Sequence, residues 1–196
     1  MAALDDAALD LIFREARTRN GWADTPVSDA EIEAIYDLLK WAPTSGNGSP
    51  ARFVWVKSAA EKEKLAACSS GSNAAKILAA PVTVLIGRDR EFHEKLPELF
   101  PHGPYMYELM RDNEAVRAAT AQRNATLQGA YLIIAARALG FDCGPMSGFD
   151  AAKVNEAFFA ATTVEVDFIC SIGHGTEENL FPRLPRLSFA DANRIV

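Results

Sequence analysis

The chain has 196 residues and a formal net charge of −6, with 49% hydrophobic and 23% charged residues. This is an ordinary composition for a soluble protein, and the length suits one domain with a sizeable core. An acidic chain without a dense basic run argues against a nucleic-acid binder. No apolar run approaches the roughly 20 residues of a membrane span, and no basic leader opens the chain, so we expect a cytoplasmic protein without a membrane partner.

Residues 4–16 carry an apolar stripe at helical spacing and predict a first helix. Ser28 opens a second helix through a capping box, because Glu31 follows three residues later. A proline at position 43 ends this helix, and the continuous apolar run at 82–86 is typical of a buried strand. Between them the pattern predicts a strand at 53–56 and short helices at 59–67 and 73–80.

Residues 92–112 break this pattern, because prolines and a glycine are interleaved with aromatic residues. A long helix is predicted over 113–139 with Gly140 as its C-cap. Its second half, 127–139, is apolar on nearly all faces, so we expect it in the middle of the fold. The remaining predicted elements are a strand at 141–144, an Asp150-capped helix to residue 159, a strand at 164–172 and a Ser188-capped helical turn.

Short strands with mostly helical connections indicate an α+β or an α/β fold. No internal repeat and no linker divides the chain, so we expect a single domain over residues 1–196.

The cysteines and histidines offer no metal or disulfide pattern. Cys68, Cys143 and Cys170 lie far apart and form no CxxC pair, so we expect free, buried thiols. His93 precedes a glutamate but lacks the second histidine of an HExxH motif. We therefore expect no metal site, and interpret His93 as a residue on a surface helix.

Several familiar motifs are incomplete. Gly46-Asn47-Gly48 and Gly173-His174-Gly175 begin like dinucleotide-binding fingerprints, but the third glycine is missing from both. No GxxxxGK[ST] sequence supports nucleoside triphosphate chemistry. Ser147 follows Gly-Pro-Met, and a nucleophile elbow requires glycine where the proline stands. A serine hydrolase is therefore disfavoured.

The loop at 43–50 is the most informative segment. It combines two prolines, two glycines, an asparagine and three hydroxyl residues between an apolar helix and an apolar strand. Such a loop offers backbone N–H groups and short polar side chains to a ligand.

Three further polar groups are unexplained by packing: residues 17–20, Asn73 with Lys76, and Arg183 with Arg186. Arginine matches the charge and the acceptor geometry of a phosphomonoester. Arg17, Arg19 and Arg186 are therefore candidates to share one phosphate, although each alone would be interpreted as a solvated surface residue.

Together these segments resemble the FMN-dependent nitroreductase family. That family has an N-terminal basic segment, an A-P-S/T-x-x-N-x-x-P loop, an N-x-x-K before a buried strand, a G-P-x-x-G-F-D turn and a C-terminal arginine. All five occur here in order and cover nearly the whole chain. Segments 44–52, 99–103, 144–150 and 183–189 are further similar to the malonic semialdehyde reductases of bacterial pyrimidine utilisation.

The resemblance implies an α+β sandwich, in which helices flank a central, mostly antiparallel sheet and FMN lies at a homodimer interface. The residues implied to hold the FMN phosphate and ribityl chain are Arg17, Thr18, Arg19, Asn20, Arg183 and Arg186.

The flavin ring has its own implied contacts. Asn73 and Lys76 would meet the pyrimidine edge of the ring, where a cation stabilises the reduced flavin. Many relatives have glutamate in place of Ser147, so we expect its backbone to act there. The backbone implied near flavin N5 is that of Pro145, Met146, Ser147 and Gly148. The residues implied to come from the second subunit are Pro43, Thr44, Ser45 and Asn47.

The implied reaction is reduction of malonic semialdehyde to 3-hydroxypropionate with NADPH or NADH as co-substrate. Arg52 or Arg111 would meet the substrate carboxylate, and the stretch 100–107, with His102, Tyr105 and Tyr107, would be a lid or a crossing loop that fills core. No dedicated proton donor is evident. The alternatives are a broad-specificity NAD(P)H nitroreductase or quinone reductase, and a non-catalytic flavin- or partner-binding protein.

Overall fold

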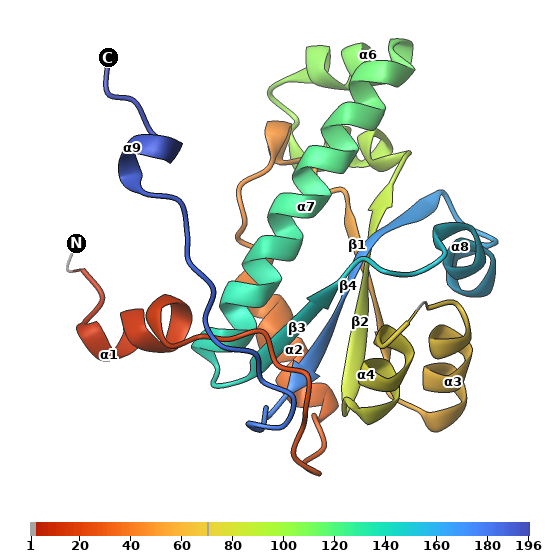
Figure 1. The fold of residues 1–196 in the computed structure, drawn as a ribbon. Helices are drawn as coiled ribbons and strands as arrows, with labels where there is room; N and C mark the ends of the chain where they lie inside the picture. Colours follow the sequence, from red (N-terminus) through yellow and green to blue (C-terminus); the bar gives the residue numbers. More distant parts are fainter. Residues whose placement is uncertain (1–2, 70) are drawn as a thin grey trace.

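The computed structural model describes residues 3–69 and 71–196. Its central element is an antiparallel sheet with the strand order β1-β2-β4-β3 (Figure 1). The strands are β1 (Ala51–Val56), β2 (Val82–Asp89), β3 (Asp142–Met146) and β4 (Val164–Gly173). Because every pairing between these strands is antiparallel, the α+β class is confirmed.

The helices follow the sequence-based boundaries closely over most of the chain. The α-helices are α1 (Asp6–Leu9), α2 (Asp29–Leu39), α3 (Ala59–Ala67), α4 (Asn73–Ala79), α5 (Leu96–Leu99), α6 (Pro104–Asp112), α7 (Glu114–Ala138), α8 (Ala151–Phe159) and α9 (Phe189–Ala192). A π-helical turn, η1 (Asp10–Arg14), and two 3₁₀ turns, η2 (Ser45–Asn47) and η3 (Phe92–Lys95), complete the described elements.

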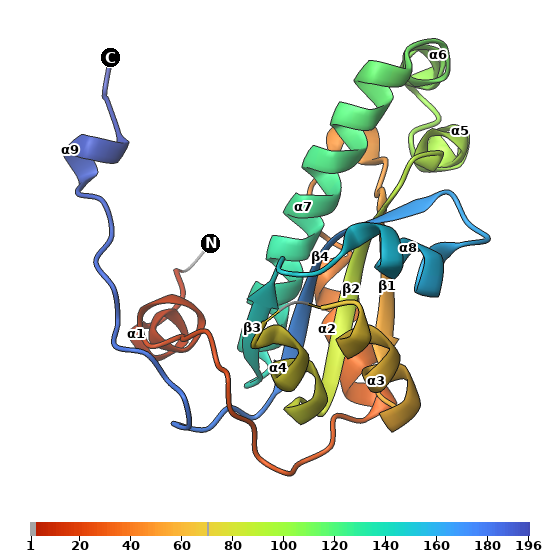
Figure 2. The same cartoon turned by 45° about the vertical axis from the view of Figure 1, so that its right-hand side comes forward.

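Helices cover both faces of the sheet (Figures 1 and 2). On one face α2 and α7 bury a core that includes Val84 and Leu132. On the other face α3, α4 and α8 bury a second core that includes Leu65 and Leu85. Val84 and Leu85 are neighbours in β2 and point to opposite faces, as the period of a strand requires.

Side-chain caps fix several helix starts. Ser28 and Glu31 form the predicted capping box of α2: the Ser28 backbone N–H donates to Glu31 Oε2 at 2.7 Å and the Glu31 N–H donates to Ser28 Oγ at 3.2 Å. The first of these bonds lowers the pKa of the Glu31 carboxyl. The ionised box is therefore present at neutral pH and is lost only as pH falls through that lowered pKa. Asp150 and Ser188 also cap the helices predicted for them.

Two predicted segments are corrected. The helix expected over 4–16 ends at Leu9 and continues as the wider turn η1, in which Ile12 is the buried residue. The stretch 92–112, in which the pattern failed, contains η3, α5 and α6. Pro97 and Pro104 lie in the first turns of α5 and α6, where a missing N–H has no helical partner to lose. The prolines therefore begin helices here rather than break them.

The second half of α7 is buried on one side only. Leu132 and Ala136 are fully buried, whereas Leu127 and Tyr131 remain 43% and 38% exposed. The expectation that this half lies in the middle of the fold is therefore confirmed for the side of Leu132 and Ala136 and wrong for the side of Leu127 and Tyr131.

The three cysteines are free and buried, as predicted. A hydrogen bond with Cys143 and then burial raise the pKa of the Cys170 thiol well above its usual value, so this thiol stays protonated and unreactive. Among the described residues, no helix combines the length and the apolar character that a membrane span requires.

The different burial of α2 and α9 predicts a difference between the serines that cap these two helices. Ser28→Ala should lower the free energy of unfolding by about 1 kcal/mol, because α2 buries Ile35 and Leu39. Ser188→Ala should leave it nearly unchanged, because α9 buries none of its residues. Urea denaturation of both variants measures the difference, and equal losses would contradict it.

Candidate functional site

A cavity of about 550 Å³ opens where the N-terminal segment, the end of α7 and the C-terminal tail meet. The segment that follows η1 forms one wall, and the tail after β4 forms another. The residues that line this basic cavity are Phe13, Ala16, Arg17, Thr18, Asn20, Lys76, Arg137, Phe181, Pro182, Arg183, Leu184 and Arg186.

The lining carries basic side chains and no carboxylate. The cations are Arg17, Lys76, Arg137, Arg183 and Arg186. Like charges gathered in one cavity repel one another. The cluster also stands out because the protein as a whole is acidic, with a net charge of −6. The arrangement therefore suits an anionic ligand that carries more than one negative charge.

The hydrogen bonds of these arginines leave donors free for a ligand. Arg17 donates to the Phe181 carbonyl, and Arg183 donates to the Ala16 carbonyl at 3.3 Å, so both tie the tail to the N-terminal segment. Arg137 donates through Nη1 to the Ile12 carbonyl at 3.3 Å, while its buried Nε has no partner. A buried donor without an acceptor is costly, and an anion in the cavity would supply one.

The polar segment 17–20 is held against β3. Thr18 forms a parallel bridge with Cys143, and the Arg19 N–H donates to the Cys143 carbonyl at 3.1 Å. A Cβ at Gly144 would lie 2.7 Å from the Arg19 carbonyl oxygen, so only glycine permits this approach. The contact places residues 17–20 beside the strand that leads into the 145–148 turn.

Two further cavities adjoin the basic cavity. One includes Gly144, Pro145 and Met146 in its lining, and the other, of about 480 Å³, includes Trp22. Asn20 and Lys76 line all three cavities, so they lie where the spaces meet. Within the described residues, no carboxylate forms an ion pair with Lys76. Its charge therefore remains available at this junction.

Asn73 and the 145–148 turn are joined directly. The Asn73 amide donates to the Gly148 carbonyl at 3.1 Å, so this side chain positions the turn. Ser147 is exposed and lines a shallow cavity with Pro145, Met146 and Phe168.

The Arg19 guanidinium has its hydrogen-bond partners outside the basic cavity. It donates to Glu177 Oε1 at 2.8 Å and to the Thr176 carbonyl at 3.1 Å, and it lies 3.4 Å from Asp142 Oδ1. The bond to Glu177 is the main cause of the raised pKa of Arg19. Arg19 does not line the basic cavity with Arg17 and Arg186. Of the three arginines predicted to share one phosphate, only Arg17 and Arg186 therefore line the same cavity.

The loop that carries Pro43, Thr44, Ser45 and Asn47 is anchored near the middle of α7. The Ser45 N–H donates to Asn124 Oδ1 and the Asn47 amide donates to the Leu99 carbonyl, each at 2.9 Å. Asn124 and Arg137 are 13 positions apart in α7, which corresponds to about 20 Å along the helix axis. One chain therefore holds this loop and the basic cavity well apart.

The predicted substrate residues do not line the basic cavity either. Arg52 pairs with Asp89 at 2.7 Å and Arg111 with Asp112 at 2.7 Å, so both guanidinium groups already have carboxylate partners. His102 is exposed beside Phe100, and Tyr105 is 62% exposed.

Tyr107 supports the second interpretation of its segment. With Phe100 it packs partly against a small core of Phe92, Leu96, Met110 and Ala121. The segment was predicted to be either a lid or a loop that fills core. The structure shows core packing for Phe100 and Tyr107, and the lid stays a prediction.

The sequence analysis missed Arg137, Phe13 and Phe181. Arg137 is the one charged residue in the apolar run 127–139, which was a usable signal. Phe13 and Phe181 gave no such signal, because an apolar residue near a chain end is ordinary.

The structure is thus an α+β sandwich of two helical layers around one sheet, with a basic, carboxylate-free cavity beside the edge strand β3. The sequence also matches the profile of the Nitroreductase family over residues 14–174. The chain belongs to the nitroreductase family.

Relatives of the same length support this assignment. A protein of Caulobacter sp. (strain K31) is 55% identical over 196 residues, which is all of both chains, and one of Stenotrophomonas maltophilia (strain R551-3) is 57% identical over 193 residues, 98% of each. Both are named, provisionally, as NADH dehydrogenase/NAD(P)H nitroreductase.

Solved structures share the fold at low identity. The nitroreductase YdfN of Bacillus subtilis, itself a provisional assignment, has a TM-score of 0.86 at 22% identity over 98% of this chain and 100% of its own. A provisional nitroreductase of Exiguobacterium sibiricum, solved in complex with FMN, has a TM-score of 0.86 at 18% identity over 100% and 99% of the two chains.

Proposed function

We propose that this protein binds FMN in the basic cavity and uses it as an NAD(P)H-dependent oxidoreductase of broad acceptor range. The observation that carries the proposal is the cavity itself, which gathers basic side chains without a carboxylate and leaves Arg137 Nε unpartnered. A phosphomonoester carries close to two negative charges and accepts several hydrogen bonds. The FMN complex of the Exiguobacterium sibiricum protein supports the choice of ligand.

The residues fit the different parts of FMN. Arg17, Arg137 and Arg186 would hold the phosphate, because their guanidinium groups share one cavity. Thr18 and Asn20 offer short polar side chains to the ribityl hydroxyls. Arg183 ties the tail to the Ala16 carbonyl and so helps to close the cavity wall.

The flavin ring would extend from the basic cavity toward the 145–148 turn, where one chain alone leaves a cavity of only about 20 Å³ and a second copy would complete the space. Bound FMN supplies hydride exchange between a nicotinamide and an electron acceptor. Lys76 would place a positive charge at the ring edge, which stabilises negative charge that develops there. Asn73 would act by holding the turn through the Gly148 carbonyl, and the backbone of Met146 and Ser147 would border the ring.

A second copy of the chain would complete the site. The loop at 43–50 and the basic cavity lie about 20 Å apart along α7 in one chain. The exposed face of α7 presents Leu127 and Tyr131, and the tail leaves the body (Figure 2) with Leu184 and Leu187 at least 70% exposed. Apolar surface of this kind is typical of an oligomer interface. We infer a homodimer in which Pro43, Thr44, Ser45 and Asn47 of one copy border the flavin of the other.

The ion pairs of the predicted substrate residues indicate which electron acceptors the protein reduces. Arg52 and Arg111 are paired with Asp89 and Asp112, so neither offers a free guanidinium to a substrate carboxylate. The relatives' names also refer to nitroreductase activity. We therefore favour nitro and quinone acceptors. Malonic semialdehyde reduction in pyrimidine degradation is the narrower hypothesis, and a cytoplasmic location stays a prediction.

The arginines of the cavity give the first test of this function. Arg137→Ala and Arg186→Ala should each remove a charge-assisted hydrogen bond of about 1.5–3 kcal/mol, which is about a 10- to 150-fold loss of FMN affinity. Arg14→Ala is the control, because Arg14 pairs with Asp6 and Asp10 outside the cavity. Quenching of FMN fluorescence in titrations measures all three, and equal affinities would refute the phosphate assignment.

An acceptor panel tests the reaction. The purified protein should be yellow, release FMN on denaturation, and oxidise NADH or NADPH with a nitroaromatic compound and with a quinone. A preference for malonic semialdehyde by more than about 100-fold in kcat/KM would establish the narrower hypothesis instead. Bound FMN without turnover of any acceptor would show a non-catalytic flavin protein.

Mixed dimers test the composite site. Arg186→Ala removes a cation of the cavity, and Asn47→Gly removes the side chain of the loop while tolerating its φ of 51°. Each variant alone should lose activity. In a mixed dimer one site carries both changes and the other carries neither, so co-expression should restore activity. If one chain formed the whole site, the mixture would show only the average of the two variants.

A further inference from the structure

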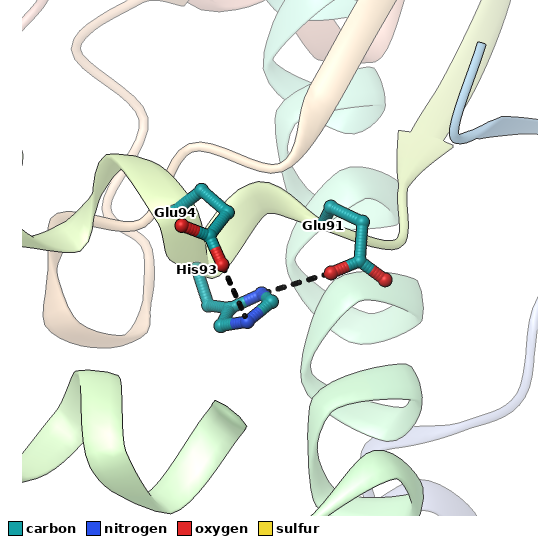
Figure 3. Close-up of side chains that lie close together, drawn as sticks. All are labelled: Glu91, His93 and Glu94. Atoms are coloured by element: carbon teal, nitrogen blue, oxygen red, sulfur yellow. Dashed lines mark ion pairs between the residues drawn. The ribbon is translucent and has the colours of Figure 1, made fainter. Parts of the chain in front are cut away.

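A second polar cluster lies at the start of the 92–112 segment, away from the residues of the basic cavity. Glu91 precedes η3, and His93 and Glu94 belong to it (Figure 3). One ligand atom from each of the three side chains lies within 4.8 Å of the other two. Figure 3 shows both carboxylates turned toward the imidazole ring.

His93 is buried, against the expectation of a surface helix. It is 2% exposed, and its Nδ1 is buried without a hydrogen-bond partner. Buried polar atoms in folded proteins almost always have a partner, so this nitrogen requires an explanation. The nearest carboxylate oxygen, Glu91 Oε2, lies 3.7 Å away, which is too far for a hydrogen bond.

That separation fits two ligands of one metal ion. Zinc binds nitrogen and carboxylate oxygen at about 2.0–2.2 Å, so two such ligands at a tetrahedral angle lie about 3.4 Å apart. The 3.7 Å between Nδ1 and Glu91 Oε2 is close to this value. Glu94 Oε1 lies 3.3 Å from the other ring nitrogen, Nε2, and the side chain is 59% exposed, so it can turn toward the ion.

The surroundings fix the ring and leave the ligand oxygens available. His93 stacks on Tyr107 with ring centroids 5.7 Å apart and an interplanar angle of 21°. Arg117 approaches Glu91 through Oε1 at 3.5 Å and donates to the Met110 carbonyl at 2.9 Å. Glu91 Oε2 thus faces the imidazole, and the carboxylate of Glu94 is largely exposed to solvent.

We propose that Glu91, His93 and Glu94 form a binding site for a divalent transition-metal ion of the Zn²⁺ class. One imidazole nitrogen with two carboxylates suits Zn²⁺ better than Mg²⁺, which prefers oxygen ligands in octahedral geometry. The ion would link Glu91, which precedes η3, to His93 and Glu94 within η3, and so would stiffen the turn that follows β2. The proposal is independent of the flavin site, because its evidence and its readout are metal binding.

The test is calorimetric titration of the tag-free, full-length protein, as purified, with Zn²⁺. The expected result is one tight site per chain that Mg²⁺ does not fill. Glu94→Gln should weaken this site about 10-fold or more, and a rise in the melting temperature on adding Zn²⁺ should disappear with it. Glu98→Gln is the matched control, because Glu98 is an exposed glutamate of α5 outside the cluster.

Melting curves of the variants separate a loss of metal binding from a loss of folding. Glu94 is largely exposed, so its replacement should leave the metal-free melting temperature unchanged. His93→Gln should also remove the site, and its folding is checked by the same melting curve. Absence of a Zn²⁺ site in the unaltered protein, or equal affinity in Glu94→Gln and Glu98→Gln, overturns the proposal.

Discussion

The contact between residues 18–19 and β3 determines the geometry of the flavin-binding region that we propose. The Arg19 N–H donates to the Cys143 carbonyl, and the Arg19 carbonyl lies where a side chain at Gly144 would be. This approach aligns the N-terminal segment with the strand that continues into the 145–148 turn. It also turns the Arg19 side chain toward Asp142 and Glu177, while Arg17 faces the basic cavity. Two arginines only two positions apart thus have different surroundings: Arg17 lines the cavity, and Arg19 forms ion pairs with Asp142 and Glu177.

The helix α7 sets the distance between the two groups of polar residues. Its Asn124 anchors the loop at 43–50, and its Arg137 reaches the basic cavity. This spacing of about 20 Å along the helix axis is the reason that we assign the two groups around one ligand to different copies of the chain. The exposed Leu127 and Tyr131 lie between these positions on the same helix. The homodimer that we propose therefore uses α7 both as a spacer and as a contact surface.

Local signals in the sequence were enough for most of the fold. Ser28, Asp150 and Ser188 identified helix starts, and the run at 82–86 identified the buried strand. The helices within 92–112 were not predicted, because a proline that begins a helix looks in the sequence like one that ends it. The cavity was predicted only in part. Arg17 and Arg186 stood out as basic residues at the chain ends, but the partners of Arg19 and Arg52 depend on long-range packing. The partner of Arg111 is the adjacent residue Asp112. The burial of His93 under Tyr107 likewise arises only in three dimensions.

The C-terminal tail also separates folding of the sheet from closing of the basic cavity. Phe181, Arg183 and Arg186 supply one wall of this cavity, yet they lie outside the central sheet, whose last strand ends at Gly173. Hydrogen bonds from Arg17 to the Phe181 carbonyl and from Arg183 to the Ala16 carbonyl hold the tail against the N-terminal segment. In the site that we propose, cofactor capture would therefore wait for the tail to dock, and clipping of the tail by a protease would release the cofactor while the sheet stays folded.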